Sequence, residues 1–287
     1  MVNFSFSPTA YWAANAAQRQ AIVWEKGNTD YFPFLSSSLN WAEFHHLVSQ
    51  TANLLITKGV RTDQVIAYSG THRLIGLLCY CSAIVIGARI LMLNPALSES
   101  QRQTILSTYQ IDILITDQDF ANFQQNQTAY LNSNWDSHRP ATLTLTSGSS
   151  GMPKAVVHSA QNHLENAEGV CELMQFCQTD SWLLSLPLFH VSGQGIVWRW
   201  LVQGATLVVN EQKDQFLLVW IVFRTLHWFL LSCSVIYRLK RKNYRDKEIL
   251  IRWHCDSQNV SGASAAGRYY VLFRLWNDGN GINYLCG

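Results

Sequence analysis

A run of small and hydroxylated residues at 146–154, with the sequence T-S-G-S-S-G-M-P-K, has the composition of an anion-binding loop. Glycine lacks a Cβ, so Gly148 and Gly151 can adopt positive φ and let the backbone approach a ligand closely. Successive backbone N–H groups in such a turn converge on an anion, hydroxyls add donors, and a lysine adds a mobile positive charge. The predicted polyphosphate ligands are Thr146, Ser147, Gly148, Ser149, Ser150, Gly151 and Lys154.

The spacing differs from that of the Walker loop, which needs four residues between its glycines, a Lys-Ser or Lys-Thr pair and a helix after it. Here two residues separate the glycines, Pro153 precedes the lysine, and the following A-V-V-H favours a strand. The order strand, loop, strand resembles the phosphate-binding loop of the adenylate-forming (AMP-binding) enzymes, which include acyl- and aryl-CoA ligases, luciferases and the adenylation domains of peptide synthetases. The family pattern is matched up to its final glycine, which is Ala155 in this sequence.

A second segment, residues 186–193 with the sequence L-P-L-F-H-V-S-G, resembles the part of the same family that leaves a core strand and passes the acyl pocket. The resemblance implies that His190 lies beside the acyl adenylate, which makes Lys154 and His190 the candidate catalytic residues. On the residues alone, a half-buried structural histidine is an equally good interpretation of His190.

The next segment, residues 192–201 with the sequence S-G-Q-G-I-V-W-R-W-L, places an arginine between two tryptophans. A guanidinium in apolar company needs an anion or an aromatic face, because an unpaired buried charge is very unfavourable. The block is similar to that of the o-succinylbenzoate–CoA ligases of menaquinone biosynthesis, whose substrate carries a second, aromatic carboxylate. This resemblance implies that Ser192 and Arg199 bind the carboxylate that does not react, beside His190 and Gly193. The alternative is an arginine that extends from an amphipathic helix to solvent.

The resemblance implies an ATP-dependent acid–CoA ligase. ATP and a carboxylic acid would give an acyl adenylate and pyrophosphate, and CoA would then form the thioester, with Mg²⁺ and lysine stabilising charge on the phosphates. The implied cofactors are ATP and Mg²⁺, with CoA as co-substrate, and we single out no metal ligand. The partners are small molecules, without nucleic acid or membrane. The nearest alternative is another aryl- or acyl-CoA ligase.

Composition agrees with an enzyme core. The chain has 287 residues, a net charge of +2 and 14% charged residues, so we expect one or two domains and no basic surface for nucleic acid. Its seven cysteines form no C-x-x-C pair and are odd in number, which favours a reducing compartment over a disulfide framework or a zinc site. The N-terminal residues lack the features of a signal peptide, so we expect a cytoplasmic protein.

Helical and strand patterns alternate in the first part of the chain. A helix is predicted from Trp41, with Asn40 as N-cap and Gly59 as the residue that stops it. Two more are predicted at 74–86 and 98–109, the last started by a Ser/Glu capping pattern. Strands are predicted at 65–68, 89–93, 111–116 and 141–146. This alternation predicts an α/β fold of mostly parallel sheets covered by helices, which the resemblance identifies as the N-terminal large domain of the adenylate-forming enzymes. The apolar run 74–93 is long enough to span a membrane, but Gly87 and Arg89 favour a helix followed by a strand.

The alternation ends after residue 215. Residues 216–237 could form a membrane anchor, which gives a different hypothesis, a membrane-anchored nucleotide-binding protein; however, Arg224 and His227 lie near the middle of that segment. A misread frame is the other explanation. Codons shifted by one base permit Y-G-M-T-E-M-A-S-T at 275–283 and a family-like strand and turn from 250, and a shift of two bases permits L-V-P-T-Q-L-Q-R from 227.

These three segments resemble segments of the family and occur in the same order along the chain. The shifted segment at 275–283 would supply the glutamate that helps to hold Mg²⁺. We therefore expect residues 1–215 to be a partial AMP-binding N-terminal domain and residues 216–287 to be an out-of-frame tail that packs poorly. We also expect the chain to be truncated, to lack the small C-terminal domain with its catalytic lysine, and to form no CoA thioester.

Overall fold

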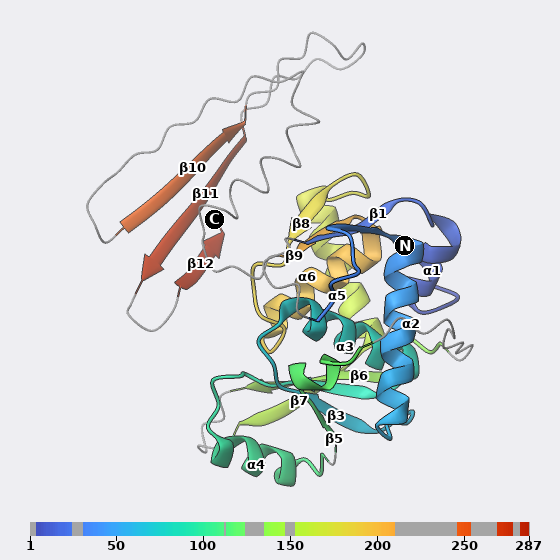
Figure 1. Cartoon of the computed structure of the whole chain (residues 1–287). Coiled ribbons are helices and arrows are strands. Elements are labelled where there is room, and N and C mark those ends of the chain that lie inside the picture. Colours follow the sequence, from blue (N-terminus) through green and yellow to red (C-terminus); the bar gives the residue numbers. More distant parts are fainter. Residues whose placement is uncertain are drawn as a thin grey trace. The chain divides into compact units, whose positions relative to one another are not determined.

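A computed structural model describes residues 4–24, 31–111, 113–123, 135–146 and 153–209, together with the backbone of three strands nearer the C-terminus. The chain divides into two compact units, Met1–Gln215 and Phe216–Gly287, which are described separately (Figure 1). The first unit contains two sheets, and the second contains one.

The middle part of the first unit's sequence forms a five-stranded sheet. Three of its neighbouring pairs are parallel, and only the last pair, β6 with β7, is antiparallel. In sheet order the strands are β5 (Ile113–Ile115), β3 (Val65–Tyr68), β4 (Arg89–Met92), β6 (Pro140–Thr146) and β7 (Lys154–Ser159). The loop 146–154 therefore joins an inner strand to the edge strand beside it.

A four-stranded sheet joins the start of this unit to its end. Strand β1 pairs in parallel with β9 and antiparallel with β2, and β9 pairs in parallel with β8. In sheet order the strands are β2 (Ser38–Asn40), β1 (Gln20–Trp24), β9 (Thr206–Val209) and β8 (Ser181–Leu183). The apolar residues of β1 and β9, such as Ile22 and its partner Leu207, are fully buried.

The helices begin at the residues that the capping patterns indicate. Helix α2 (Trp41–Thr57) has a capping box in which Asn40 accepts from the Glu43 N–H at 2.9 Å and Glu43 accepts from the Asn40 N–H at 2.8 Å. Helix α3 (Arg73–Ile86) is buried along nearly its whole length and ends at Gly87, which has φ 79°. The remaining helices are α1 (Pro8–Asn15), α4 (Glu99–Thr108), α5 (Ala160–Met174) and α6 (Val191–Gln203).

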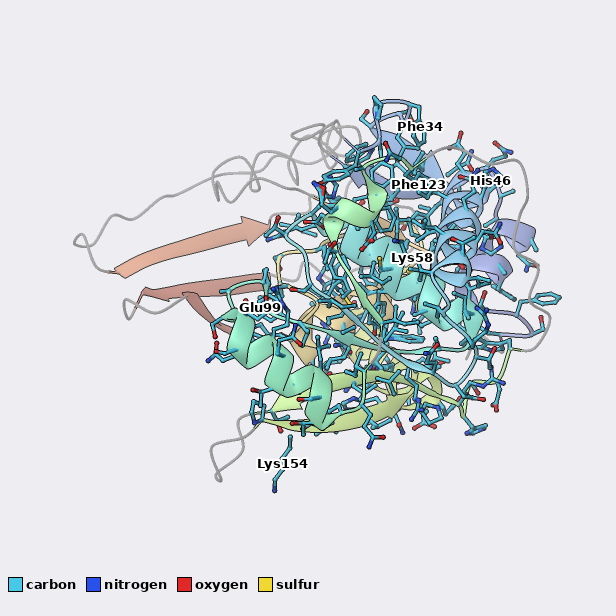
Figure 2. All side chains as sticks on the ribbon, turned by 60° about the horizontal axis from the view of Figure 1, so that its bottom comes forward. Phe34, His46, Lys58, Glu99, Phe123 and Lys154 are labelled. Atoms are coloured by element: carbon cyan, nitrogen blue, oxygen red, sulfur yellow. The ribbon has the colours of Figure 1, made fainter. Side chains whose placement is uncertain are left out.

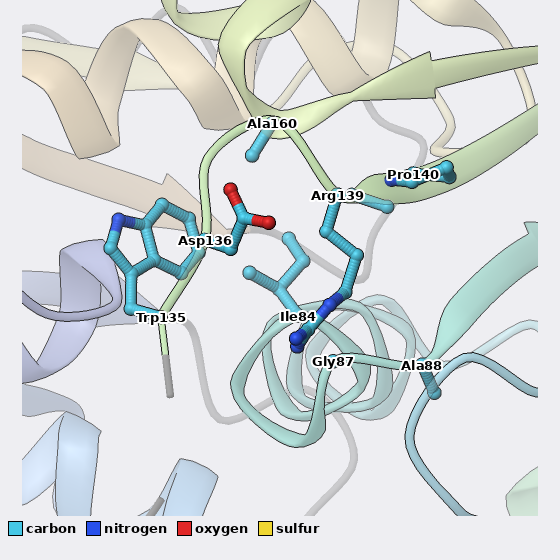
Figure 3. Close-up of a pocket in the computed structure, with 9 residues that line it drawn as sticks. Ile84, Gly87, Ala88, Trp135, Asp136, Arg139, Pro140 and Ala160 are labelled. Atoms are coloured by element: carbon cyan, nitrogen blue, oxygen red, sulfur yellow. The ribbon is translucent and has the colours of Figure 1, made fainter. Parts of the chain in front are cut away.

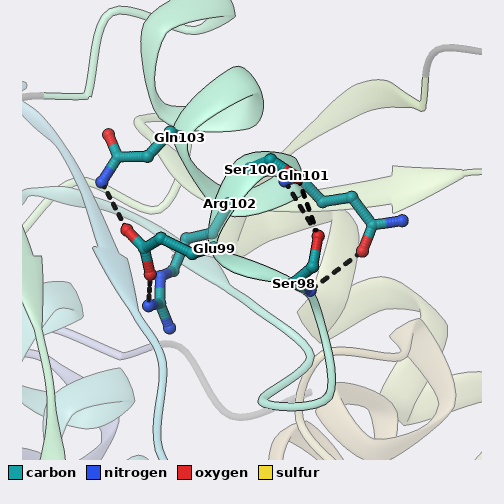
Figure 4. A network of polar contacts seen from close by, with 6 residues as sticks. All are labelled: Ser98, Glu99, Ser100, Gln101, Arg102 and Gln103. Carbon is teal, nitrogen blue, oxygen red and sulfur yellow. Dashed lines mark hydrogen bonds and ion pairs between the residues drawn. The ribbon is translucent and has the colours of Figure 1, made fainter.

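Helix α4 starts with the polar network shown in Figure 4. The Ser98 hydroxyl accepts from the Gln101 N–H, and the Gln101 side chain accepts from the Ser98 N–H at 2.9 Å. Glu99 bonds to Arg102 and to Gln103 on the next turn. The predicted cap is thus present, with Gln101 as the partner of Ser98 and Glu99 as an acidic residue in the first turn.

Helices cover both faces of the five-stranded sheet. On one face, Ala67 and Leu91 pack with Ile105 and Leu106 of α4. On the other face, the alternate strand residues Ile66 and Ile90 belong to the large core that contains α2 and α3. The predicted α/β class, with mostly parallel sheets covered by helices, is confirmed, and the run 74–93 forms α3 and β4 as expected.

Among the helices of the described part of the chain, none is both long and apolar enough to cross a bilayer. The segment 216–237 lies outside the described residues, so the anchor hypothesis stays a hypothesis. In the second unit the backbone forms an antiparallel sheet in which β11 (Tyr269–Asn277) lies between β10 (Asp246–Trp253) and β12 (Ile282–Cys286). The poor packing expected of the tail also stays a prediction.

Candidate active site

The strands on either side of the predicted phosphate loop are in register. Thr146 is paired with Lys154, and the Thr146 hydroxyl donates to the Lys154 carbonyl at 3.2 Å. The two side chains are exposed, and Figure 2 shows Lys154 extending away from the ribbon. Among the described residues, no ion pair involves Lys154. Its ammonium group is therefore available to an anion held by the loop.

The other predicted phosphate ligands, Ser147, Gly148, Ser149, Ser150 and Gly151, lie outside the described residues. What the structure does place is the pair of strand ends that bracket them. An antiparallel pair that closes at Thr146 and Lys154 confirms the predicted order of strand, loop and strand, which distinguishes this loop from the Walker type.

Tyr109, at the C-cap of α4, holds the backbone on both sides of Lys154. Its hydroxyl donates to the Pro153 carbonyl at 2.6 Å and accepts from the Ala155 N–H at 3.0 Å. Because β7 is an edge strand, this hydroxyl satisfies an amide that no neighbouring strand pairs. Tyr109 could not be singled out from the sequence, since nothing in a local pattern connects it to a lysine 45 residues later.

The second predicted segment forms the start of α6. His190 is the N-cap, its N–H donates to the Pro187 carbonyl at 3.1 Å, and its carbonyl accepts from the Gly193 and Gln194 N–H groups. A Cβ at Gly193 would lie 2.2 Å from the Pro187 carbonyl oxygen, so only glycine fits there. His190 and Ser192 are exposed, and Gly193 is buried. The structure thus presents His190 and Ser192 together at one helix end.

Arg199 is half-buried on the same helix, two turns after Ser192. Its guanidinium lies 5.1 Å from the centroid of the Trp182 ring on β8. A Cβ on Gly195 would be 3.4 Å from Arg199 Nη2, so the small residue leaves room for the guanidinium along the helix. The spacing of Ser192, Gly195 and Arg199 puts all three on one helix face.

The electrostatics of Arg199 are those of a cation in need of an anion. Burial lowers the pKa of the Arg199 guanidinium, and the Cys171 thiol acts in the opposite direction. Arg199 Nε is buried without a hydrogen-bond partner among the described residues. Trp182 supplies the aromatic face that a guanidinium in apolar company requires, and Nε remains a donor whose hydrogen bond is not made within the described part of the chain.

The two predicted sites meet at a hydrogen bond. Gln194 of α6 donates to the Thr144 hydroxyl of β6 at 3.2 Å, and Thr144 lies two residues before Thr146. The beginning of α6, with His190 and Ser192, therefore packs beside the strand that leads into the phosphate loop.

A histidine pair lies behind this junction. His163 of α5 is hydrogen-bonded to Thr142 at 2.7 Å and stacks on Trp198 at a centroid distance of 5.0 Å. Burial, together with the neighbouring His158, lowers the pKa of His163 to about 3. His163 is therefore neutral at physiological pH and has a structural role in this part of the site.

The small cavity of Figure 3 lies elsewhere, beside the first residues of β6. It is lined by Trp135, Asp136 and Arg139 on one side and by the end of α3 on the other. Its volume of about 10 Å³ corresponds to roughly one water molecule, which is far too small for a nucleotide. Among the described residues, no group of three His, Cys, Asp or Glu side chains could hold a metal ion.

Comparisons of the whole chain with known proteins give one consistent result. A family model described as AMP-binding enzyme matches residues 10–239. The chain is 47% identical over 173 residues to the 2-succinylbenzoate–CoA ligase of Haemophilus influenzae, which covers 60% of this chain and 38% of that protein. It is 34% identical over 195 residues to the enzyme of the same name from Escherichia coli, which covers 66% of this chain and 43% of that protein.

A solved structure gives a similar result. An E. coli MenE variant with bound OSB-AMS superposes with a TM-score of 0.65 at 30% identity, over 75% of this chain and 47% of that chain. The chain thus spans about 40% of the length of the two curated relatives, 38% in one case and 43% in the other.

Proposed function

Because the chain belongs to the AMP-binding enzyme family, we propose that residues 1–215 form the ATP- and acid-binding part of an acid–CoA ligase that acts on o-succinylbenzoate. The observation that carries this proposal is the β6–β7 pair, which closes on the glycine- and hydroxyl-rich loop with Lys154 exposed at its end. The proposal is further supported by the similarity to two 2-succinylbenzoate–CoA ligases and to MenE with bound OSB-AMS.

In the proposed reaction a carboxylate oxygen attacks the α-phosphorus of ATP and the bond to pyrophosphate breaks. The CoA sulfur then attacks the acyl carbonyl, the bond to AMP breaks and the thiol proton is released. Lys154 would stabilise negative charge on the phosphates, as an ammonium group with no competing ion pair among the described residues. Mg²⁺ would supply further charge neutralisation on the phosphates, and we assign it to no side chain of this chain.

The acid would lie along the first two turns of α6. His190 is exposed at the N-cap and would adjoin the carboxylate that reacts with ATP. Arg199 and Ser192 share a helix face and would hold the aromatic carboxylate, with Trp182 keeping the guanidinium in place. An arginine suits this role because its planar fork bonds both oxygens of a carboxylate.

The substrate assignment is tested by comparing two acids. We expect o-succinylbenzoate, in the presence of a non-hydrolysable ATP analogue, to bind at least about tenfold more tightly than 4-oxo-4-phenylbutanoate, since one charge-assisted contact contributes about 1.5–3 kcal/mol. Calorimetric titration of the purified chain measures both affinities. Equal affinities would reject the o-succinylbenzoate assignment and favour another aryl- or acyl-CoA ligase.

We propose further that residues 216–287 are translated out of frame and that the chain as it stands forms no CoA thioester. The support is the three family-like segments permitted by shifted codons after residue 227. The family match runs to residue 239 in the frame as translated, which is beyond the proposed boundary at 215. Sequencing of the DNA from codon 205 onward locates the position at which the frame changes. Thioester formation at the rate of an intact ligase would contradict the proposal.

A further inference from the structure

Gln194 is a fully buried amide with every polar atom of its side chain in use. Its Nε2 donates to the Thr144 hydroxyl at 3.2 Å and to the Leu188 carbonyl at 3.0 Å. Its Oε1 accepts from the Tyr80 hydroxyl at 3.5 Å. A buried amide with all its bonds made is costly to displace, because any move leaves a polar atom unpaired away from water.

The partners of Gln194 belong to the two halves of the proposed site. Thr144 lies on the same face of β6 as Thr146, whose hydroxyl bonds the Lys154 carbonyl. Leu188 lies two residues before His190, and the Gln194 backbone N–H donates to the His190 carbonyl at 3.2 Å. One side chain therefore connects the strand that enters the phosphate loop with the turn that carries His190.

Helix α3 holds this side chain from behind. Tyr80 is fully buried, and its hydroxyl, which donates to Gln194, accepts from Trp198 Nε1 at 2.8 Å. Burial raises the pKa of Tyr80, so the hydroxyl keeps the proton that it donates. The partners of the amide lie on β6, on α3 and in the turn before α6, and together they fix the position of α6 along β6.

We propose that Gln194 is a positioning residue that sets the start of α6, and with it His190 and Ser192, against the strand that ends at Thr146. Through this contact, binding of a nucleotide at 146–154 and binding of an acid at 190–199 favour each other. The second statement rests on the proposed function, whereas the first concerns the chain without ligands.

Hydrogen exchange of the full chain, without ligands, tests the first statement. Gln194→Met keeps the size of the side chain and removes its hydrogen bonds. Gln50→Met is the matched control, since Gln50 is also a buried helical glutamine, 3% exposed, but bonds His46 within α2. We expect exchange in 187–193 and 142–146 to rise at least about tenfold in Gln194→Met and to stay unchanged there in Gln50→Met.

Unchanged exchange in those two segments, or an equal rise throughout 1–209, would overturn the proposal, because a merely structural glutamine loosens the core as a whole. If Gln194→Met does not fold, Thr144→Val replaces it. That variant removes one bond of the same amide and is expected to raise exchange in 187–193 about threefold or more. No change in Thr144→Val would equally overturn the proposal.

Ligand coupling tests the second statement. The affinity for o-succinylbenzoate is measured with and without a non-hydrolysable ATP analogue, in the wild-type chain and in Gln194→Met. We expect the analogue to tighten acid binding at least about fivefold in the wild type and less than about twofold in the variant. Coupling preserved in the variant would contradict the inference. Absence of binding by the wild-type chain would instead contradict the proposed function, and the exchange result would then decide the role of Gln194.

Discussion

The two sheets of the first unit are assembled in different ways. The five-stranded sheet uses one continuous part of the chain, from Val65 to Ser159, and carries the phosphate loop between its last two strands. The four-stranded sheet combines strands from the beginning of the chain with strands that begin at Ser181 and Thr206, and it carries Trp182 beneath Arg199. The proposed nucleotide site therefore lies within one continuous part of the chain, whereas the helix that carries the proposed acid site packs against segments distant in sequence.

Tryptophans hold those distant segments together. Trp12 Nε1 donates to the Leu201 carbonyl at 2.6 Å, and Trp200 Nε1 donates to the Ala21 carbonyl at 3.0 Å. Trp41 and Trp200 stack at a centroid distance of 4.9 Å. The position of α6, which carries the proposed acid site, is thus set by residues near the beginning of the chain. Because Gln194 connects the two halves, we expect substitutions around the four-stranded sheet to weaken acid binding more than nucleotide binding, without leaving the second wholly unaffected.

The largest effect is expected from Trp200→Ala. Trp200 is fully buried, so its loss should lower the free energy of unfolding by about 3–5 kcal/mol. Denaturant unfolding measures this loss, and Trp135→Ala, at a half-buried position, is the control with a smaller expected cost. Acid binding should suffer more than nucleotide binding. If the affinities for acid and nucleotide fell equally, the two sheets would not differ in the ligand whose binding they support.

Arg199→Leu should come next, with an effect confined to the acid. We expect o-succinylbenzoate binding to weaken by about 2–4 kcal/mol, or roughly 30- to 1000-fold, because a buried carboxylate would lose its cation. Nucleotide affinity should stay within about twofold, as should the affinity for 4-oxo-4-phenylbutanoate. Arg199→Lys keeps the positive charge but loses the planar guanidinium. Its affinity for o-succinylbenzoate should therefore lie between those of the wild type and Arg199→Leu. Unchanged discrimination between the two acids would refute the assigned role of Arg199.

Low pH should lower the free energy of unfolding, because His163 is buried as a neutral side chain behind the junction of the two halves. The pKa of His163 is lowered from an unfolded value of about 6.5 to about 3, so the unfolded chain binds more protons between those values. Stability should therefore fall as pH falls from about 6.5 toward 3, by up to about 1.4 kcal/mol per pH unit from this group.

The pKa of His45, lowered to about 4 mainly by burial, adds a contribution of the same sign. Unfolding measured at pH 7, 5 and 4 should show a shallower slope in His163→Gln than in the wild type. A slope unaltered by that substitution would assign the acid sensitivity to other groups.

Trp182→Leu should have the smallest effect. Loss of the cation–π contact to Arg199 should weaken o-succinylbenzoate binding by about 0.5–1 kcal/mol, which is roughly two- to fivefold. Trp182→Phe keeps an aromatic face and should recover part of the affinity. A change in nucleotide binding of the same size would show that Trp182 acts on the whole unit rather than on Arg199.

Local signals were sufficient for the elements between residues 40 and 108. Periodicity and caps predicted α2, β3, α3, β4 and α4 to within about two residues, because apolar spacing and terminal polar residues act over single turns. The pairing of β1 with β9 and the contacts of Tyr109 and Gln194 were not predicted. These depend on segments that are distant in sequence, and no local pattern of residues encodes such a meeting.

In the candidate site, too, local sequence predicted single residues but not the contacts between elements. Motifs predicted roles for Thr146, Lys154, His190, Ser192 and Arg199, because glycine, proline and charged residues at fixed spacing have local physical meaning. These roles stay predictions. Trp182 could not be assigned to Arg199 in this way, since no spacing relates a strand residue to a particular residue of the helix that follows it.

Calorimetric titration of the chain with MgATP tests directly whether the loop between Thr146 and Lys154 binds a triphosphate. We expect a single site, and we expect Lys154→Gln to weaken ATP binding at least about fivefold, in line with the loss of one charged contact of about 1 kcal/mol or more. We also expect Lys58→Gln, a control in which another surface lysine loses its ion pair with Asp119, to leave the affinity unchanged. Absence of ATP binding even after the reading frame is restored, or equal affinity in Lys154→Gln and the wild type, would contradict the proposed triphosphate site.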